Sequence, residues 1–164
     1  MKIKLSFLIA ALTFFGAVHA QEQTVPNAKV KNINQVDIDF SEVIDSGKIT
    51  VVSFWATWCG PCIKELRAID EYYEMWQEDY NMKFVAVSID DARNVKKVKP
   101  FVLGEGWTYD IILDQNQELA RKMNVNNPPM TFVIDASGNI VYSHQGYTPG
   151  AEFELEEQLK KLQE

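Results

Sequence analysis

Short apolar runs alternate along the chain with segments in which apolar residues recur every three or four positions. A short run rich in β-branched and aromatic residues is typical of a buried strand, whereas the wider spacing is typical of an amphipathic helix. Ile49–Trp55 is the clearest run of the first kind. The segment after it carries apolar residues on one helical face: Cys62, Leu66, Ile69, Tyr73 and Trp76. The pattern therefore predicts a strand that leads directly into a long helix.

The same two patterns predict a full set of elements. The predicted strands are Val30–Ile33, Val36–Ile38, Ile49–Trp55, Met82–Asp90, Tyr109–Leu113, Thr131–Asp135 and Ile140–Gln145. The predicted helices are Phe40–Ile44, Pro61 to about Tyr80, Asn94–Leu103, Asn116–Met123 and Ala151–Leu162. Pro100 should bend or shorten the third of these helices. Strands alternating with helices, followed by a terminal hairpin and helix, indicate an α/β fold with helices on both faces of the sheet.

The first twenty residues have the pattern of a cleavable secretory signal. Lys2 and Lys4 precede an apolar run from Leu5 to Val18, and cleavage after Ala20 would leave Gln21 as the first residue. The run is shorter than the ~20 residues that a membrane span needs. An uncleaved anchor is the alternative, and in both cases we expect the domain to lie outside the cytoplasm, in the periplasm. The predicted organisation is a signal at 1–20, a flexible lead-in at 21–29 and a single domain at 30–164.

Charge and cysteine usage narrow the possible functions. Without Lys2 and Lys4, the chain has 14 basic side chains against 23 acidic ones, a net charge of −9. This balance argues against a nucleic-acid partner and favours a soluble protein, which we expect to be a monomer. An exported protein enters an oxidising space in which disulfides persist. Both cysteines of this chain nevertheless lie in one motif, Trp58-Cys59-Gly60-Pro61-Cys62.

Two cysteines in one motif favour reversible redox chemistry over structural cross-linking. The motif lies where the predicted strand ends and the helix begins, and Pro61 suits the first helical turn. Free backbone N–H groups and the helix dipole favour negative charge there, and therefore a thiolate. Cys59, the more N-terminal and more exposed thiol, is the expected nucleophile. Cys62, inside the helix, is placed to resolve the mixed disulfide.

Two other interpretations of the motif are less well supported. Half of a zinc site is one of them, but the chain has no second CxxC, and His144 is the only histidine past the leader. A structural disulfide is the other, but so short a loop removes little chain entropy. We therefore expect no metal, and no cofactor other than the redox-active cysteine pair.

The residues Val-Val-Ser-Phe-Trp-Ala-Thr-Trp-Cys-Gly-Pro-Cys at 51–62 strongly resemble the thioredoxin superfamily. Three further segments are similar to its exported TlpA/ResA-like branch: Val85–Asp90, Pro129–Asp135 and Gly138–Val141. The resemblance covers about Val30 to Leu162. It implies a thioredoxin-like fold with a central mixed β-sheet flanked by helices, an N-terminal β-hairpin and an inserted helix–strand unit after Asp90.

The resemblance also implies residues that contact substrate. In the superfamily, the proline before the terminal hairpin is cis and lies beside the dithiol, and the matching residue is Pro129. Pro128 before it would present a carbonyl but no N–H to a bound peptide. Met130 stands where the branch usually has threonine, so local contacts can differ. Around the cysteines, we expect Trp58, Gly60 and Pro61 to contact substrate.

An acid near the second cysteine is expected at Glu65. Plain thioredoxin has a buried aspartate six residues before its first active-site cysteine, and that position is Ser53 here. The branch instead resembles this chain in having Cys-x-x-Cys-x-x-Glu. Helical spacing independently places Glu65 on the apolar arc, where burial would disfavour its charged form and suit it to exchange a proton with Cys62. The alternative is that the Glu65 side chain turns to solvent. Separately, we expect His144, near the end of the last predicted strand, to be a surface residue.

The resemblance implies a thiol–disulfide oxidoreductase that works through a Cys59 mixed disulfide resolved by Cys62. Gly-Pro between the cysteines resembles the reducing thioredoxins, which favours a reductase of disulfides in exported proteins, with apocytochrome c a candidate. Such an enzyme needs a membrane dithiol as its electron donor. Two alternatives remain open at this point: a disulfide-forming oxidase, and a redox-switched binding or metal-carrier module.

Overall fold

The computed structural model describes residues 23–163, which form a mixed β-sheet with helices on both sides. The seven strands lie in the order β2-β1-β5-β4-β3-β6-β7. Their bounds are β1 Lys29–Asn32, β2 Asp37–Asp39, β3 Ile49–Trp55, β4 Met82–Ser88, β5 Asp110–Leu113, β6 Met130–Ile134 and β7 Ile140–Gln145. The central strands β3, β4 and β5 are parallel, and the strands outside them are antiparallel. The predicted signal at 1–20 lies outside the described residues.

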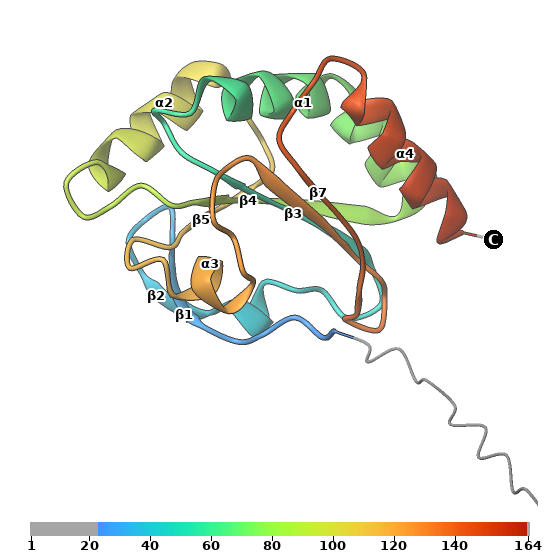
Figure 1. Cartoon of the computed structure of the whole chain (residues 1–164), viewed down its shortest axis with the longest axis horizontal. Coiled ribbons are helices and arrows are strands. Elements are labelled where there is room, and N and C mark those ends of the chain that lie inside the picture. Colours follow the sequence, from blue (N-terminus) through green and yellow to red (C-terminus); the bar gives the residue numbers. More distant parts are fainter. Residues whose placement is uncertain (1–22, 164) are drawn as a thin grey trace, which may run out of the picture.

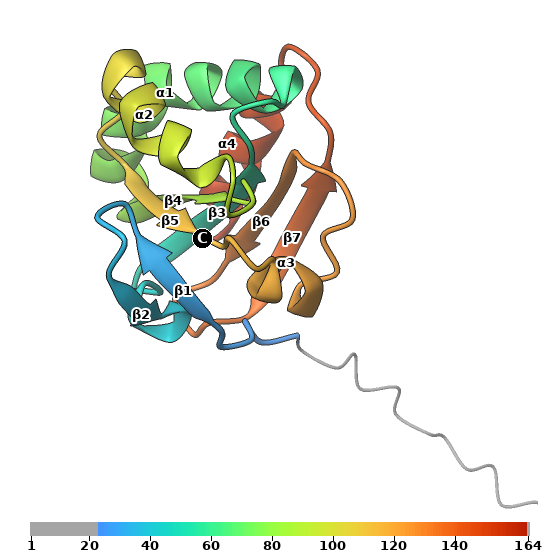
Figure 2. The same cartoon turned by 90° about the vertical axis from the view of Figure 1, so that its left-hand side faces the viewer.

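The helices cover the two faces of the sheet unequally. Figure 1 shows α1, α2 and α4 along one face, at the top of the view, with α3 on the opposite face, and Figure 2 gives the same layers from the side. Their bounds are α1 Gly60–Tyr80, α2 Val98–Glu105, α3 Glu118–Lys122 and α4 Ala151–Lys161, with short 3-10 turns at Phe40–Glu42 and Val95–Lys97. The predicted α/β fold, its N-terminal hairpin and the inserted unit, α2 with β5, are confirmed.

Pro100 divides the helix that was predicted over Asn94–Leu103. The segment begins as a 3-10 turn, and the α-helix starts at Val98, so Pro100 is its third residue. The first turn of a helix does not need that residue's N–H group, so the proline is accommodated there. The helix then continues beyond the predicted end, to Glu105.

The terminal hairpin contains an irregularity that sets which side chains face α1. The strands β6 and β7 pair Ile134 with Ile140, but Val133 with Tyr142, so the register shifts between these pairs. Such a bulge inserts one extra residue, here Val141, and moves the rest of the strand by one position. As a result, Thr131 lies opposite His144.

Residues 23–28 of the predicted lead-in run along the hairpin turn. Thr24 forms an isolated bridge with Asn139, and the Val25 N–H donates to the Gly138 carbonyl at 3.2 Å. Ala28 is buried in the core. This part of the lead-in therefore packs on the domain. Within residues 23–163, no helix combines the length and apolarity that crossing a membrane requires.

The inserted unit, α2 with β5, packs against the rest of the core through aromatic rings. Trp107, between α2 and β5, lies with its ring centroid 5.4 Å from that of Trp55 and 5.5 Å from that of Tyr109. Phe101 of α2 completes the cluster, 5.8 Å from both tryptophans. Trp107 and Tyr109 are both buried.

We expect Trp107→Ala to lower the free energy of unfolding by about 3–5 kcal/mol, because it removes a buried ring and leaves a cavity. Trp58→Ala is the matched control, since Trp58 is 62% exposed, and it should change stability by no more than about 0.5 kcal/mol. Urea denaturation followed by circular dichroism measures both. Equal losses in the two variants would contradict the packing described here.

Candidate active site

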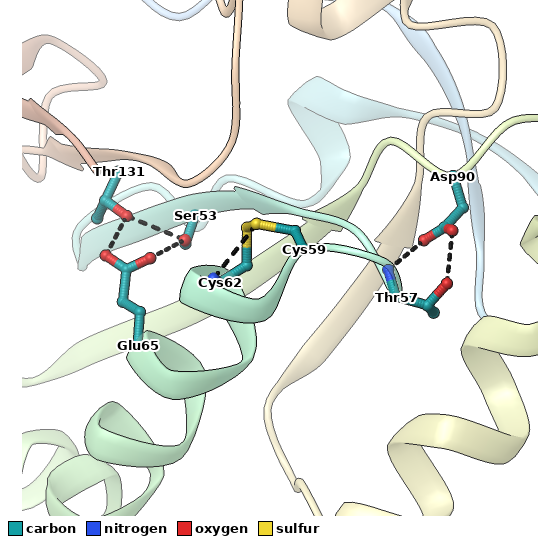
Figure 3. Close-up of a disulfide and its surroundings, with 7 residues drawn as sticks. All are labelled: Ser53, Thr57, Cys59, Cys62, Glu65, Asp90 and Thr131. Carbon is teal, nitrogen blue, oxygen red and sulfur yellow. Dashed lines mark hydrogen bonds between the residues drawn. A yellow bond between two sulfur atoms is a disulfide. The ribbon is translucent and has the colours of Figure 1, made fainter. Parts of the chain in front are cut away.

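The two cysteines form a disulfide at the first turn of α1. Cys59 has extended backbone dihedrals and caps the helix, and its sulfur accepts a hydrogen bond from the Cys62 N–H at 3.3 Å. Pro61 lies in the first turn, as predicted. The backbone donor and the helix dipole both favour negative charge at Cys59 once the disulfide is reduced. Figure 3 shows the sulfur pair between two hydrogen-bonded groups of side chains.

The surroundings of the two sulfurs are unequal. Cys59 is 6% exposed, whereas Cys62 is completely buried. Trp58 immediately before them is the large exposed side chain of this loop, and Gly60 and Pro61 are exposed as well. The predicted order of exposure is therefore confirmed, and a partner's sulfur can reach the pair only from the Cys59 side.

Pro129 immediately precedes β6, the strand next to this loop, and the Pro128–Pro129 peptide bond is cis, as the resemblance implied. Met130 pairs with Phe54, so Pro129 lies at the end of the sheet where β3 passes into the cysteine motif. The Pro129 carbonyl accepts a hydrogen bond from the Gly146 N–H at 2.8 Å. That the two prolines contact substrate stays a prediction, as it does for Trp58, Gly60 and Pro61.

Glu65 is only 2% exposed, and it meets three polar side chains that lie in one row across the sheet. Ser53 on β3 pairs with Thr131 on β6, which pairs with His144 on β7. Residues opposite one another on neighbouring strands point to the same face, here the face covered by α1. We call Ser53, Thr131 and His144 the polar row.

Every member of the polar row contacts the Glu65 carboxyl. Ser53 Oγ donates to Glu65 Oε2 at 3.2 Å, and Thr131 Oγ1 lies 2.9 Å from Glu65 Oε1. The two hydroxyl oxygens are 2.9 Å from each other, and His144 Nε2 is 3.0 Å from Glu65 Oε1. Figure 3 shows Ser53, Thr131 and Glu65 as one cluster beside Cys62. The burial of Glu65 is confirmed, while its part in proton exchange stays a prediction.

The expectation that His144 is a surface residue is wrong. Its side chain is 17% exposed, and its ring is bonded to Glu65. The strand predicted at Ile140–Gln145 is correct, but the bulge around Val141 turns His144 toward α1. A hairpin with unbroken register from Ile134 and Ile140 would have placed Ser143 opposite Thr131 instead.

A second polar contact holds the loop between β3 and the cysteines. Asp90, fully buried after β4, accepts hydrogen bonds from the Thr57 N–H at 2.8 Å and from Thr57 Oγ1 at 2.7 Å. Ser88 Oγ donates to the same carboxylate at 2.9 Å. Sequence reasoning missed this pair. The available signal was that Thr57 and Asp90 follow two parallel strands, whose carboxyl ends meet at one edge of the sheet.

Within residues 23–163, no group of three or more His, Cys, Asp or Glu side chains is arranged to hold a metal ion.

Comparison with known proteins places this site in a family. The family model described as AhpC/TSA matches residues 22–143. The chain belongs to the AhpC/TSA family. A thioredoxin-like protein of Porphyromonas gingivalis, solved in solution, is 42% identical, with a TM-score of 0.76 over 84% of this chain and 90% of that protein. The expected thioredoxin-like fold is thus confirmed by a solved thioredoxin-like relative.

Two Bacillus subtilis proteins are also similar to this AhpC/TSA-family chain. Sporulation thiol-disulfide oxidoreductase A is 27% identical over 135 residues, 81% of each chain. Thiol-disulfide oxidoreductase ResA is 28% identical over 142 residues, 82% of this chain and 76% of ResA. The resemblance to the ResA-like branch is confirmed, and with its cysteine pair the chain is a thiol–disulfide oxidoreductase.

We expect iodoacetamide to alkylate Cys59 before Cys62 in the reduced protein, because Cys59 is the more exposed cysteine and its sulfur accepts the helix N–H bond. Brief labelling followed by mass mapping of the peptides measures the order. The urea-unfolded, reduced protein is the control, in which both cysteines should label alike. Faster labelling of Cys62 in the folded protein would reverse the assigned roles.

Proposed function

We propose that this thiol–disulfide oxidoreductase is a reductase of disulfides in proteins outside the cytoplasm. The observation that carries the proposal is the Cys59–Cys62 pair at the start of α1, with Gly60 and Pro61 between the sulfurs. Gly-Pro in these positions resembles the reducing thioredoxins. Thioredoxin has a potential of about −270 mV, against about −120 mV for the oxidant DsbA.

The proposed reaction transfers two electrons from the protein dithiol to a substrate disulfide. The Cys59 thiolate attacks one substrate sulfur and forms a mixed disulfide, and the other substrate sulfur leaves as a thiolate that takes a proton from solvent. Cys62 then loses its proton, and its sulfur attacks Cys59 Sγ. The bond between Cys59 and substrate breaks, the second substrate thiolate leaves, and the protein is left as the Cys59–Cys62 disulfide.

Glu65 is the proposed acceptor of the Cys62 proton. Cys62 is buried, so its proton has no direct path to solvent, and Glu65 lies one helical turn further along α1. The polar row supplies hydrogen bonds to the carboxyl, which stabilise it in a buried position. In the oxidised form described here, the partners of Glu65 are Ser53, Thr131 and His144.

We infer the location and the partners from the sequence. Residues 1–20 have the pattern of a secretory signal, which supports action in the periplasm. A reductase there must be reduced again after each turnover, and we propose a membrane dithiol as the electron donor. The substrates are disulfide-containing proteins, with apocytochrome c as one candidate.

The equilibrium potential of the cysteine pair tests the direction of the reaction. Incubation in dithiothreitol buffers of graded ratio, followed by alkylation and mass measurement, should give a value closer to about −270 mV than to about −120 mV. A value close to that of DsbA would instead make the protein a disulfide-forming oxidase.

Cys62→Ser should accumulate the mixed disulfide through Cys59, which identifies the substrate, whereas the Cys59→Ser control should trap nothing.

Glu65→Gln should keep the fold and slow disulfide exchange near pH 7 by at most the order of 10²-fold, because a group that exchanges protons has been removed. It should also change the pH dependence of thiol titration. Stopped-flow kinetics between pH 5 and 9 measure the effect. Glu78→Gln, an exposed position on the same helix, is the control. If Glu65→Gln reacts like the wild type throughout this range, Glu65 has no role in proton exchange.

A further inference from the structure

His144 stands between the buried carboxyl of Glu65 and the protein surface. Its Nε2 atom is 3.0 Å from Glu65 Oε1. The same side chain lines an open hollow of about 280 Å³, together with Gly146, Tyr147 and Glu154. Glu65 itself is almost without solvent exposure, so the imidazole is the ionisable group of the polar row through which the cluster meets solvent.

The hydroxyl groups of the polar row cannot hydrogen-bond the carboxyl fully by themselves. Ser53 Oγ, Thr131 Oγ1 and the Glu65 oxygens form a closed ring of short oxygen–oxygen distances. Each hydroxyl carries one hydrogen, so one side of this ring has none when the carboxyl is ionised. His144 Nε2, 3.0 Å from Glu65 Oε1, is placed to be the further donor in the tautomer that carries its hydrogen on Nε2.

We propose that His144 is the positioning residue of Glu65, whose Nε2–H holds the carboxyl on the polar row in its ionised form, ready to take the proton of Cys62. The inference rests on the proposed function, in which Glu65 accepts that proton. The step remains balanced as written above: the proton moves from Cys62 to Glu65, and His144 only donates a hydrogen bond. The attack of Cys62 on the mixed disulfide and the reverse of that step use the same atoms. The role of His144 therefore does not depend on whether the protein reduces or oxidises its substrate.

Other ionisable groups surround the pair. The β6 and β3 strands contribute only the uncharged hydroxyls of Thr131 and Ser53 at this point. Burial, followed by the carboxylates of Glu152 and then Glu65, raises the pKa of the Tyr147 hydroxyl, which donates to Glu152 at 3.2 Å. The remaining groups are Cys62 and Glu71 on α1, Tyr109 just before β5, Tyr142 on β7 and Glu154 on α4.

The test follows the resolving step alone. The reduced protein reacts with the aromatic disulfide 5,5′-dithiobis(2-nitrobenzoate): Cys59 releases the first thionitrobenzoate, and the attack of Cys62 releases the second. The rate of the second release is measured by stopped-flow absorbance from pH 5 to 9. The proteins compared are wild type, His144→Phe, His144→Gln, Glu65→Gln and the double variant Glu65→Gln/His144→Phe, each checked for folding by circular dichroism.

We expect His144→Phe to move the Glu65-dependent limb of the pH–rate profile upward by about one to two pH units, the equivalent of one hydrogen bond to a charged group. At the pH halfway between the two midpoints, the rate should fall about three- to tenfold. His144→Gln can place an amide N–H near the position of Nε2 and should restore most of the shift. In the Glu65→Gln background, His144→Phe should have no further effect. Ser143→Ala, on the exposed side of β7, is the control and should match wild type.

Different results would overturn different claims. If Glu65→Gln slows the second release while His144→Phe follows the wild-type profile, the inference about His144 is wrong and the role of Glu65 stands. The inference is also wrong if the His144→Phe shift persists in the Glu65→Gln background, or if His144→Gln does not reduce it. If Glu65→Gln itself behaves like wild type, the proposed proton acceptor fails, and the role of His144 fails with it.

Discussion

The buried carboxyl of Glu65 is the constraint on which the site depends. A carboxyl removed from water costs several kcal/mol unless hydrogen bonds replace those of the solvent. No single element supplies these partners: one comes from each of the strands β3, β6 and β7, and the carboxyl itself comes from α1. The sheet register and the docking of α1 must therefore both be correct before Glu65 can be buried. The same docking places the first turn of α1, and so the cysteine pair, at the end of the sheet.

The sequence predicted the parts of the site that local periodicity determines. Glu65 lies on the apolar arc of a long helix, and this position favoured the burial that the structure shows. His144 could not be placed in this way, because its orientation depends on a bulge ten residues downstream of Thr131, around Val141. A one-residue shift turns every following side chain to the other face. Nothing in the local pattern of β-branched and polar residues marks that shift.

The contact between Thr57 and Asp90 shows a different limit of prediction from the sequence. Thr57 follows one predicted strand and Asp90 was predicted as the last residue of the next, and both strands exist, but which strands lie side by side is a property of the topology. The cis bond before Pro129 is a third case, since only the resemblance to a known superfamily indicated it. Strand and helix identities were thus predictable from residue types, whereas contacts between distant segments required either the fold or a relative.

The path of the chain into the domain has a consequence for any attachment at its N-terminus. Residues 23–25 lie against the turn between β6 and β7, while Pro129 and the cysteine loop lie at the other end of the same strands. The length of β6, roughly 17 Å at about 3.4 Å per residue, separates the two ends. In Figure 1 the blue start of the described chain lies below the sheet, away from the start of α1. A group attached at residue 23 therefore lies at the opposite end of the hairpin strands from Trp58 and Cys59 and does not border the cysteine pair.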